Sequence, residues 1–133
     1  MRGGPLDVVA ELTATWASAP AAAPLPGYAC VVSKRHVVEP YELAPDERGA
    51  FWDEAMVVAQ ALASLYEPVK LNYEIHGNVV PHLHLHLYPR YEGDPYGTGA
   101  LGRREESFTR TEPELAAIGE AIRAAYGTQS APR

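Results

Sequence analysis

The sequence is poor in cysteine and lysine, and each shortage excludes a class of protein. Cys30 is the single cysteine in 133 residues, so the chain can form no internal disulfide and no Cys-x-x-Cys metal or redox site. Seventeen acidic residues outnumber eleven basic ones, for a formal net charge of −6, and Lys34 and Lys70 are the only lysines. Binding to long nucleic acids requires a basic surface that neutralises phosphates. This composition therefore argues against long nucleic acids but allows a small phosphorylated ligand.

Long hydrophobic runs are also missing. No stretch approaches the roughly 18 consecutive apolar residues of a membrane-spanning helix. The N-terminus has some features of a signal peptide, with Arg2 followed by apolar residues and a small-residue stretch at 19–23. However, Asp7 and Glu11 interrupt the segment that would have to be apolar. We therefore expect a cytoplasmic protein that does not interact with membranes.

The chain has the size and apolar content of one domain. Its mass is 14.4 kDa, and 47% of its residues are hydrophobic, which is enough for one compact core. Residues 1–26 are rich in alanine and proline and are interpreted as a leader, ordered or not, before a domain at 27–133. Within the leader, residues 8–15 are compatible with either a strand or a helical turn.

Apolar periodicity predicts two helices. The first begins at Pro45, with acidic residues in its first turn, and ends before Pro68. The second begins near Pro113 and has Gly127 as its expected C-cap. Residues 89–111 contain several glycines and prolines and are predicted to form a long loop. The stripes expected to face the core are Phe51, Ala55, Val58, Leu62 and Leu65 in the first helix, and Leu115, Ile118, Ile122 and Ala125 in the second.

Other segments are predicted to be strands. Residues 28–33 form a short apolar run after Gly27, and residues 69–76 and 82–88 alternate between apolar and polar. The two alternating segments are joined by a short connection with a glycine, which predicts an antiparallel hairpin. In such a hairpin one face is apolar and the other polar. We expect an α+β fold in which the leucines of 82–88 face a helix and its histidines share the open face with Asn72.

Three alternate positions of one predicted strand, His82, His84 and His86, are histidines. They could be structural residues of a sheet surface. Two of them could also share a metal ion with ligands such as His76, Glu74 or Asp94, although the outer pair would lie about 13 Å apart on a straight strand. The third interpretation is nucleophilic catalysis, in which a neutral imidazole attacks phosphorus and its neighbours stabilise the charge on the transferring group.

Residues 77–91 resemble the signature of the histidine triad (HIT) superfamily, in which three histidines alternate with apolar residues. The segment reads Gly-Asn-Val-Val-Pro-His-Leu-His-Leu-His-Leu-Tyr-Pro-Arg-Tyr and includes the Gly-Asn before the triad and the Pro-Arg after it. The resemblance extends back to residues 27–36, which are similar to the family's upstream strand with its basic end. It implies a HIT-like fold, with a long helix packed on one face of an antiparallel sheet and a C-terminal helix.

The resemblance also implies a function. It predicts a nucleotide hydrolase or transferase that acts at the α-phosphate of nucleoside-monophosphate conjugates, such as dinucleoside polyphosphates or nucleoside phosphoramidates. His84 matches the family's nucleophile and would form a nucleotidyl-histidine, while His82 and His86 would orient it, bind phosphate oxygens and assist the leaving group. Asn72 and Asn78 match polar residues expected to contact phosphate or a triad histidine. A homodimer is implied, and no metal or other cofactor is expected.

Tyr28 departs from the family pattern. It follows Gly27 at a position where many members have a fourth histidine. A phenol can donate a hydrogen bond but stays neutral at pH 7, so Tyr28 joins the expected phosphate- or nucleotide-binding residues. The substitution favours, as an alternative, a nucleotide-binding module with little or no turnover. A metalloprotein that uses two of the triad histidines is the third alternative.

Overall fold

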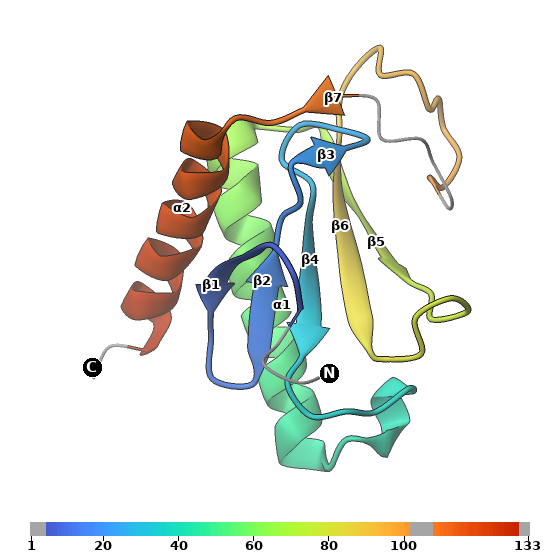
Figure 1. Ribbon diagram of the computed structural model, residues 1–133, viewed down its shortest axis with the longest axis vertical. Coiled ribbons are helices and arrows are strands. Elements are labelled where there is room, and N and C mark those ends of the chain that lie inside the picture. Colours follow the sequence, from blue (N-terminus) through green and yellow to red (C-terminus); the bar gives the residue numbers. More distant parts are fainter. Residues whose placement is uncertain (1–4, 102–107, 131–133) are drawn as a thin grey trace.

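A five-stranded antiparallel sheet forms the centre of the computed structural model, which describes residues 5–101 and 108–130 (Figure 1). The strand order is β1-β2-β4-β6-β5. These strands are β1 (Val8–Glu11), β2 (Thr15–Ser18), β4 (Ala29–Ser33), β5 (Lys70–Ile75) and β6 (His84–Arg90). A separate two-stranded pair joins β3 (Ala22–Ala23) to β7 (Phe108–Thr109).

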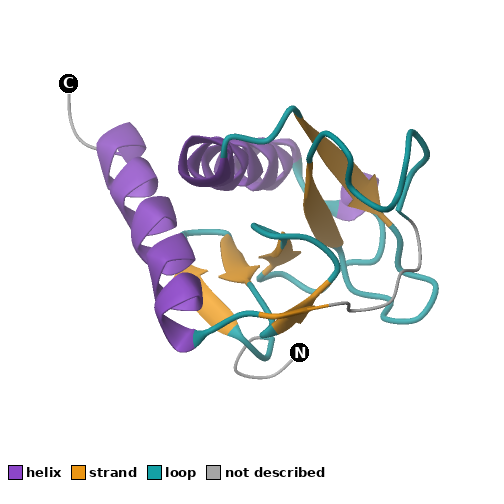
Figure 2. Ribbon diagram, turned by 90° about the horizontal axis from the view of Figure 1, so that it is seen from above, coloured by secondary structure: helices purple, strands orange, loops and turns teal. Residues whose placement is uncertain are grey.

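Two helices, α1 (Pro45–Tyr66) and α2 (Glu112–Ser130), lie on one side of the sheet (Figure 2). A short 3-10 turn, η1 (Pro40–Glu42), precedes the first of them. Helix α1 packs on β2, β4 and β6, and α2 packs on α1 and β1. Neither of these two helices therefore lies on the opposite face of the sheet. This arrangement confirms the α+β fold with a long helix on one face and a C-terminal helix.

Local sequence explains where α1 begins and ends. Pro45 occupies the first helical position, and the Glu47 carboxylate accepts the Ala44 N–H at 2.9 Å, satisfying one of the donors that a helix start leaves unpaired. At the other end Glu67 adopts a left-handed conformation with φ 50°, and Pro68 follows. A residue before proline is disfavoured in the helical region, so the helix stops there.

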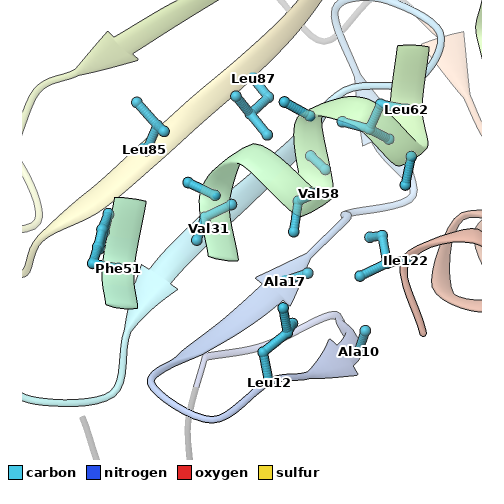
Figure 3. Close-up of a cluster of buried hydrophobic side chains, with 14 of the residues drawn as sticks. Ala10, Leu12, Ala17, Val31, Phe51, Val58, Leu62, Leu85, Leu87 and Ile122 are labelled. Atoms are coloured by element: carbon cyan, nitrogen blue, oxygen red, sulfur yellow. The ribbon is translucent and has the colours of Figure 1, made fainter. Parts of the chain in front are cut away.

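The core lies between the sheet and the helices (Figure 3). Leu83, Leu85 and Leu87 are buried in it, as the alternating pattern predicted. The predicted stripe of α1 is buried except for Leu65, which is 43% exposed because the last turn presents Tyr66 to the core instead. Ile118 and Ile122 of α2 are fully buried.

Three sequence-based boundaries are wrong. Strand β6 begins at His84 rather than residue 82, because the chain enters it through the backbone bonds Leu83 N–H to Val37 O and Ser33 N–H to Leu83 O. Helix α2 continues past Gly127, where the expected C-cap glycine is an ordinary helical residue. Within the predicted loop at 89–111, β6 takes residues 89–90 and β7 takes 108–109.

The alanine- and proline-rich leader contributes strands to the main sheet. Residues 8–11 and 15–18 form β1 and β2, which settles the choice between strand and helical turn, and β2 pairs directly with β4. The buried Glu54 of α1 holds the connection between β1 and β2. Its carboxylate accepts hydrogen bonds from the Ala14 N–H and the Thr15 hydroxyl. A division of the chain after residue 26 stays a prediction.

Replacing Gly27 with alanine is expected to lower the stability of the fold. Its φ is +81°, and an added Cβ would lie 2.8 Å from Tyr66 Cδ2 and 3.0 Å from Pro89 Cγ. Strain and overlap together should cost about 2–3 kcal/mol of the unfolding free energy, measured by urea denaturation. Gly93→Ala is the matched control, because Gly93 has φ +78° and nothing within 4 Å of the added Cβ. Equal losses in the two variants would refute a packing role for Gly27.

Candidate active site

His84 and His86 lie together on the face of the sheet opposite α1 and α2. They are two residues apart on β6, and their register partners on β4 are Val32 and Cys30. Both side chains are half-buried. Their ring centroids are 4.8 Å apart with the planes at 83°, so the two rings can contact a single bound group.

The hydrogen bond of His84 defines which of its nitrogens is reactive. Nδ1 lies 2.6 Å from the backbone carbonyl oxygen of His82. A carbonyl oxygen can only accept, so Nδ1 carries the proton of this bond. In the neutral ring Nε2 is then the atom with the free electron pair, which is the requirement for a nucleophile.

His86 is held by Tyr28. The Tyr28 hydroxyl lies 2.7 Å from His86 Nδ1, and Tyr88 stacks on the His86 ring at 5.6 Å between centroids. A phenol that donates to Nδ1 leaves the ring proton on Nε2. Burial, with smaller contributions from the nearby His84 and His76, lowers the pKa of His86 to about 4. His86 is therefore a neutral imidazole at pH 7.

His82 is buried, whereas His84 and His86 are half-buried, and its place on the open face stays a prediction. It precedes β6, and its ring is buried, with the residue 5% exposed. Its Nε2 donates to the Ser33 carbonyl oxygen at 2.6 Å, and its Nδ1 lies 2.8 Å from Nδ1 of His36. Burial lowers its pKa, so the ring is neutral and accepts from His36. What His82 offers His84 is its backbone carbonyl.

A further histidine, His76, lies beside His86. It follows β5, two residues after Glu74, which is paired with His86. The His76 and His86 centroids are 5.6 Å apart, and His76 Nε2 lies 2.9 Å from Glu74 Oε1. The sequence left His76 without a role, although its even spacing from Asn72 places it on the polar side of the hairpin.

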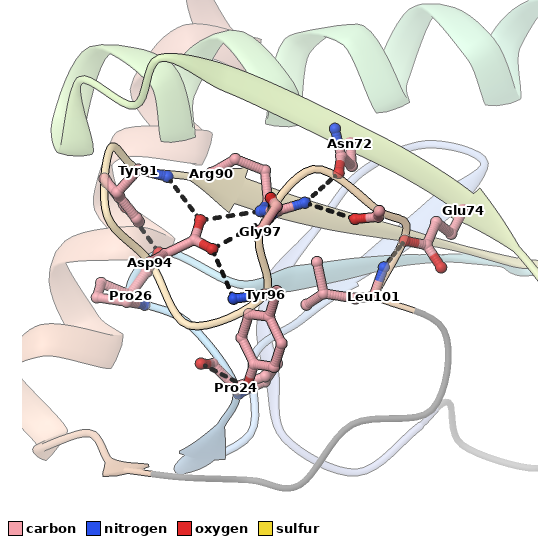
Figure 4. Close-up of polar contacts among 11 residues, drawn as sticks. Pro24, Pro26, Asn72, Glu74, Arg90, Tyr91, Asp94, Tyr96, Gly97 and Leu101 are labelled. Atoms are coloured by element: carbon pink, nitrogen blue, oxygen red, sulfur yellow. Dashed lines mark hydrogen bonds and ion pairs between the residues drawn. The ribbon is translucent and has the colours of Figure 1, made fainter.

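The two asparagines lie in different surroundings, and the phosphate contact expected of Asn72 stays a prediction. The Asn72 side-chain oxygen accepts a hydrogen bond from Arg90 Nη1 at 2.9 Å (Figure 4). Arg90 also donates to both carboxylate oxygens of Asp94 and to the carbonyl oxygens of Gly97 and Gly99. Asn72 therefore belongs to the network that holds residues 91–101. Asn78 lies exposed in the turn between β5 and β6, and its phosphate contact stays a prediction.

Residues 91–101 cover the Tyr88 end of the open face. Leu101 is fully buried in a second apolar cluster, and its N–H donates to Glu74 Oε2 at 3.0 Å. Glu74 thus joins the end of this segment to His76. The cluster consists of Leu25, Tyr88 and Leu101 with Tyr28, Tyr91 and Tyr96 packed against it.

The low pKa of His86 predicts a pH dependence of stability. In the unfolded chain a histidine binds its proton near pH 6.5, whereas in the folded chain His86 binds it only near 4. Between these values the unfolded state holds more protons, so the unfolding free energy decreases as pH falls from about 6.5 to about 4. Denaturation of the wild type and His86→Gln across this range should show a smaller decrease in the variant. Parallel curves would contradict the prediction.

Two further properties bear on function. In residues 5–101 and 108–130 no helix has the length and apolar character needed to cross a membrane. Within the same ranges, no three His, Cys, Asp or Glu side chains are grouped so as to hold a metal ion.

Comparison with known proteins gives consistent matches. Residues 4–93 match the family model described as "HIT domain". Protein hit of Bacillus subtilis (strain 168) is 31% identical over 77 residues, which is 53% of this chain and 53% of that protein, so the match spans about half of the curated relative's length.

Solved structures show the same fold. A histidine triad (HIT) protein from Sinorhizobium meliloti 1021 superposes with a TM-score of 0.79 at 24% identity, covering 89% of this chain and 87% of the other. A histidine triad protein from Marinobacter aquaeolei VT8 gives 0.78 at 23% identity, with coverages of 91% and 88%.

Proposed function

Because the chain belongs to the HIT domain family, a superfamily of nucleotide-binding hydrolases and transferases, we propose that it cleaves nucleoside-monophosphate conjugates at the α-phosphate. Dinucleoside polyphosphates and nucleoside phosphoramidates are the proposed substrate classes, and the reaction runs through a nucleotidyl-His84 intermediate. The observation that carries the proposal is the hydrogen bond from His84 Nδ1 to the His82 carbonyl, which leaves Nε2 as the nucleophilic atom.

In the first step, His84 Nε2 forms a bond to the α-phosphorus as the bond from phosphorus to the leaving group breaks. The leaving group departs with a proton. His86 contributes its Nε2–H, directed at a phosphate oxygen, because Tyr28 occupies its Nδ1. A donor fixed before substrate binds stabilises the charge that develops on the transferring group without having to reorganise.

In the second step, water attacks phosphorus, and the bond to His84 Nε2 breaks to release the nucleoside monophosphate. If another acceptor replaces water, the same intermediate makes the protein a transferase. The hydrogen bond from His84 Nδ1 to the His82 carbonyl is important in both steps, because it keeps the His84 ring oriented while Nε2 is first free and then bonded to phosphorus.

The test is incubation with an adenosine phosphoramidate and with a dinucleoside polyphosphate. The proposal expects AMP release from at least one of them, and an acid-quenched sample should show by intact mass a nucleotidyl adduct located at His84. Tight AMP binding without turnover of either substrate would instead identify a nucleotide-binding module. Inhibition by a chelator that zinc reverses would identify a metal-dependent protein.

A homodimer is part of the proposal. β5 is an edge strand of the five-stranded sheet, and it displays Tyr73 at 45% exposure. Trp52 and Met56 of α1 are also exposed. An uncovered edge strand and exposed large apolar side chains are features of an interaction surface. Sedimentation that shows only a monomer at micromolar concentration would contradict the dimer. A cytoplasmic location stays a prediction.

A further inference from the structure

We propose that His76, held by Glu74, is the acid that protonates the leaving group. The inference rests on the proposed function, since it assigns a role within that reaction. It starts from an unmet requirement: His84 supplies the nucleophile and His86 a neutral donor, but an amine or alkoxide leaves phosphorus readily only when it takes up a proton.

The first observation is position. His76 lies beside the two half-buried rings of His84 and His86. Its ring centroid is 5.6 Å from that of His86, which in turn is 4.8 Å from His84. A phosphoryl group bound to His84 and His86 therefore has His76 at its border, on the side of β5.

The second observation is the carboxylate behind His76. Glu74 Oε1 lies 2.9 Å from His76 Nε2, and the Glu74 side chain is only 10% exposed. In the imidazolium form, one ring nitrogen donates its proton to this carboxylate and the proton on the other nitrogen can be given up to a ligand. Among the described residues, His76 Nδ1 has no hydrogen-bond partner, so that atom is available to a ligand. The His86 ring forms a hydrogen bond between its Nδ1 and the phenol of Tyr28.

The third observation is what fixes Glu74 itself. Its Oε2 accepts the Leu101 N–H at 3.0 Å, and Leu101 is fully buried. The carboxylate is thus anchored from the covering segment 91–101 while its other oxygen orients His76. In this arrangement Glu74 is a positioning residue, and His76 is the residue that meets the substrate.

The protons balance over the whole cycle. As His84 Nε2 bonds to phosphorus, the bond to the leaving group breaks and the proton of His76 Nδ1 passes to the departing nitrogen or oxygen. His76 is then a neutral imidazole with no proton on Nδ1. When water attacks the nucleotidyl-His84, His76 Nδ1 takes the water's proton as the bond between phosphorus and His84 breaks, which restores the starting state.

The experiment compares kcat/KM for two AMP conjugates whose leaving groups differ in their need for a proton. One is an alkyl-amine phosphoramidate, and the other is the p-nitrophenyl ester, whose phenolate departs unprotonated. His76→Gln should lose about 100-fold or more on the phosphoramidate and less than about 5-fold on the nitrophenyl ester. Glu74→Gln should show the same selective loss at smaller size. Glu120→Gln, an exposed substitution on α2, is the matched control that should leave both unchanged.

The outcomes separate this inference from the proposed function. Equal losses on both substrates, or no loss on either, would overturn the acid role of His76 while leaving the nucleotidyl transfer intact. A wild type that cleaves neither conjugate would overturn the proposed function itself. Thermal melting of each variant identifies losses caused by unfolding, and a loss confined to the phosphoramidate cannot arise in that way, because unfolding removes both activities.

Discussion

Replacing His84 with alanine should lower the rate of AMP release by at least about 10⁴-fold, while AMP still binds. The variant has no Nε2 to attack phosphorus, so the two-step route through the nucleotidyl intermediate is lost. Binding survives because the donors around the phosphate, including His86, remain in place. The measurements are steady-state release of AMP and calorimetric titration with AMP.

A smaller substitution at the same position provides the control. His84→Gly leaves a space on the open face of β6, and free imidazole can enter such a space and act as the nucleophile. Added imidazole should therefore restore part of the rate in His84→Gly, and the adduct should form on the free imidazole rather than on the protein. A His84→Ala variant that keeps more than a tenth of the wild-type rate would contradict the nucleophilic role.

The local parts of the fold could be predicted from the sequence. A 22-residue helix bounded by Pro45 and Pro68 requires only the apolar stripe and the conformational limits of proline. The hairpin of β5 and β6 follows from alternation alone, because a period of two separates leucines from histidines. Each of these inferences depends on residues that are close in sequence.

The order of the strands could not be predicted, because it depends on contacts between distant residues. β4 pairs with β6, although α1 lies between them in the sequence. β2 pairs with β4, although the segment that contains Gly27 lies between them. The leader offered only short stretches of small residues, for which strand and turn have similar cost. Their place in the sheet is decided by partners such as Glu54 that the local sequence does not reveal.

In the candidate site, too, features set by nearby residues could be predicted from the sequence, and features set by distant contacts could not. The sequence indicated correctly that His84 and His86 share a face, because both lie inside a regular strand. It did not reveal that His82 is buried, because the hydrogen bonds of its ring to Ser33 and His36 join residues that are distant in sequence. It gave His76 no catalytic role, because the role we propose depends on Glu74, which contacts both His76 and Leu101 only in the folded chain.

Replacing Asp94 with alanine should cost about 3–5 kcal/mol of the unfolding free energy. Asp94 and Arg90 are a buried pair, with side-chain exposures of 5% and 9%, and they are joined by two hydrogen bonds of 2.9 and 3.0 Å. Without the carboxylate, the Arg90 guanidinium stays buried with its charge uncompensated. The backbone N–H groups of Tyr91 and Tyr96, both bonded to Asp94 at 3.0 Å, also lose their acceptor. Urea denaturation at pH 7 measures the loss.

The double variant Arg90→Met/Asp94→Leu distinguishes the stability contributed by the ion pair itself from the stability contributed by segment 91–101, which the pair holds. Removing both charges should recover part of the stability lost in Asp94→Ala, since no buried charge is then unpaired.

The hydrogen bonds from Arg90 and from the backbone N–H groups of Tyr91 and Tyr96 hold the pKa of Asp94 well below its usual range. Its contribution is therefore complete above pH 4, where an unfolded aspartate is ionised, and decreases as pH falls below that value. The wild type and Asp94→Ala should accordingly converge in stability toward pH 3. A difference that stays constant with pH would show that the carboxylate charge contributes nothing, and that Asp94 acts through packing alone.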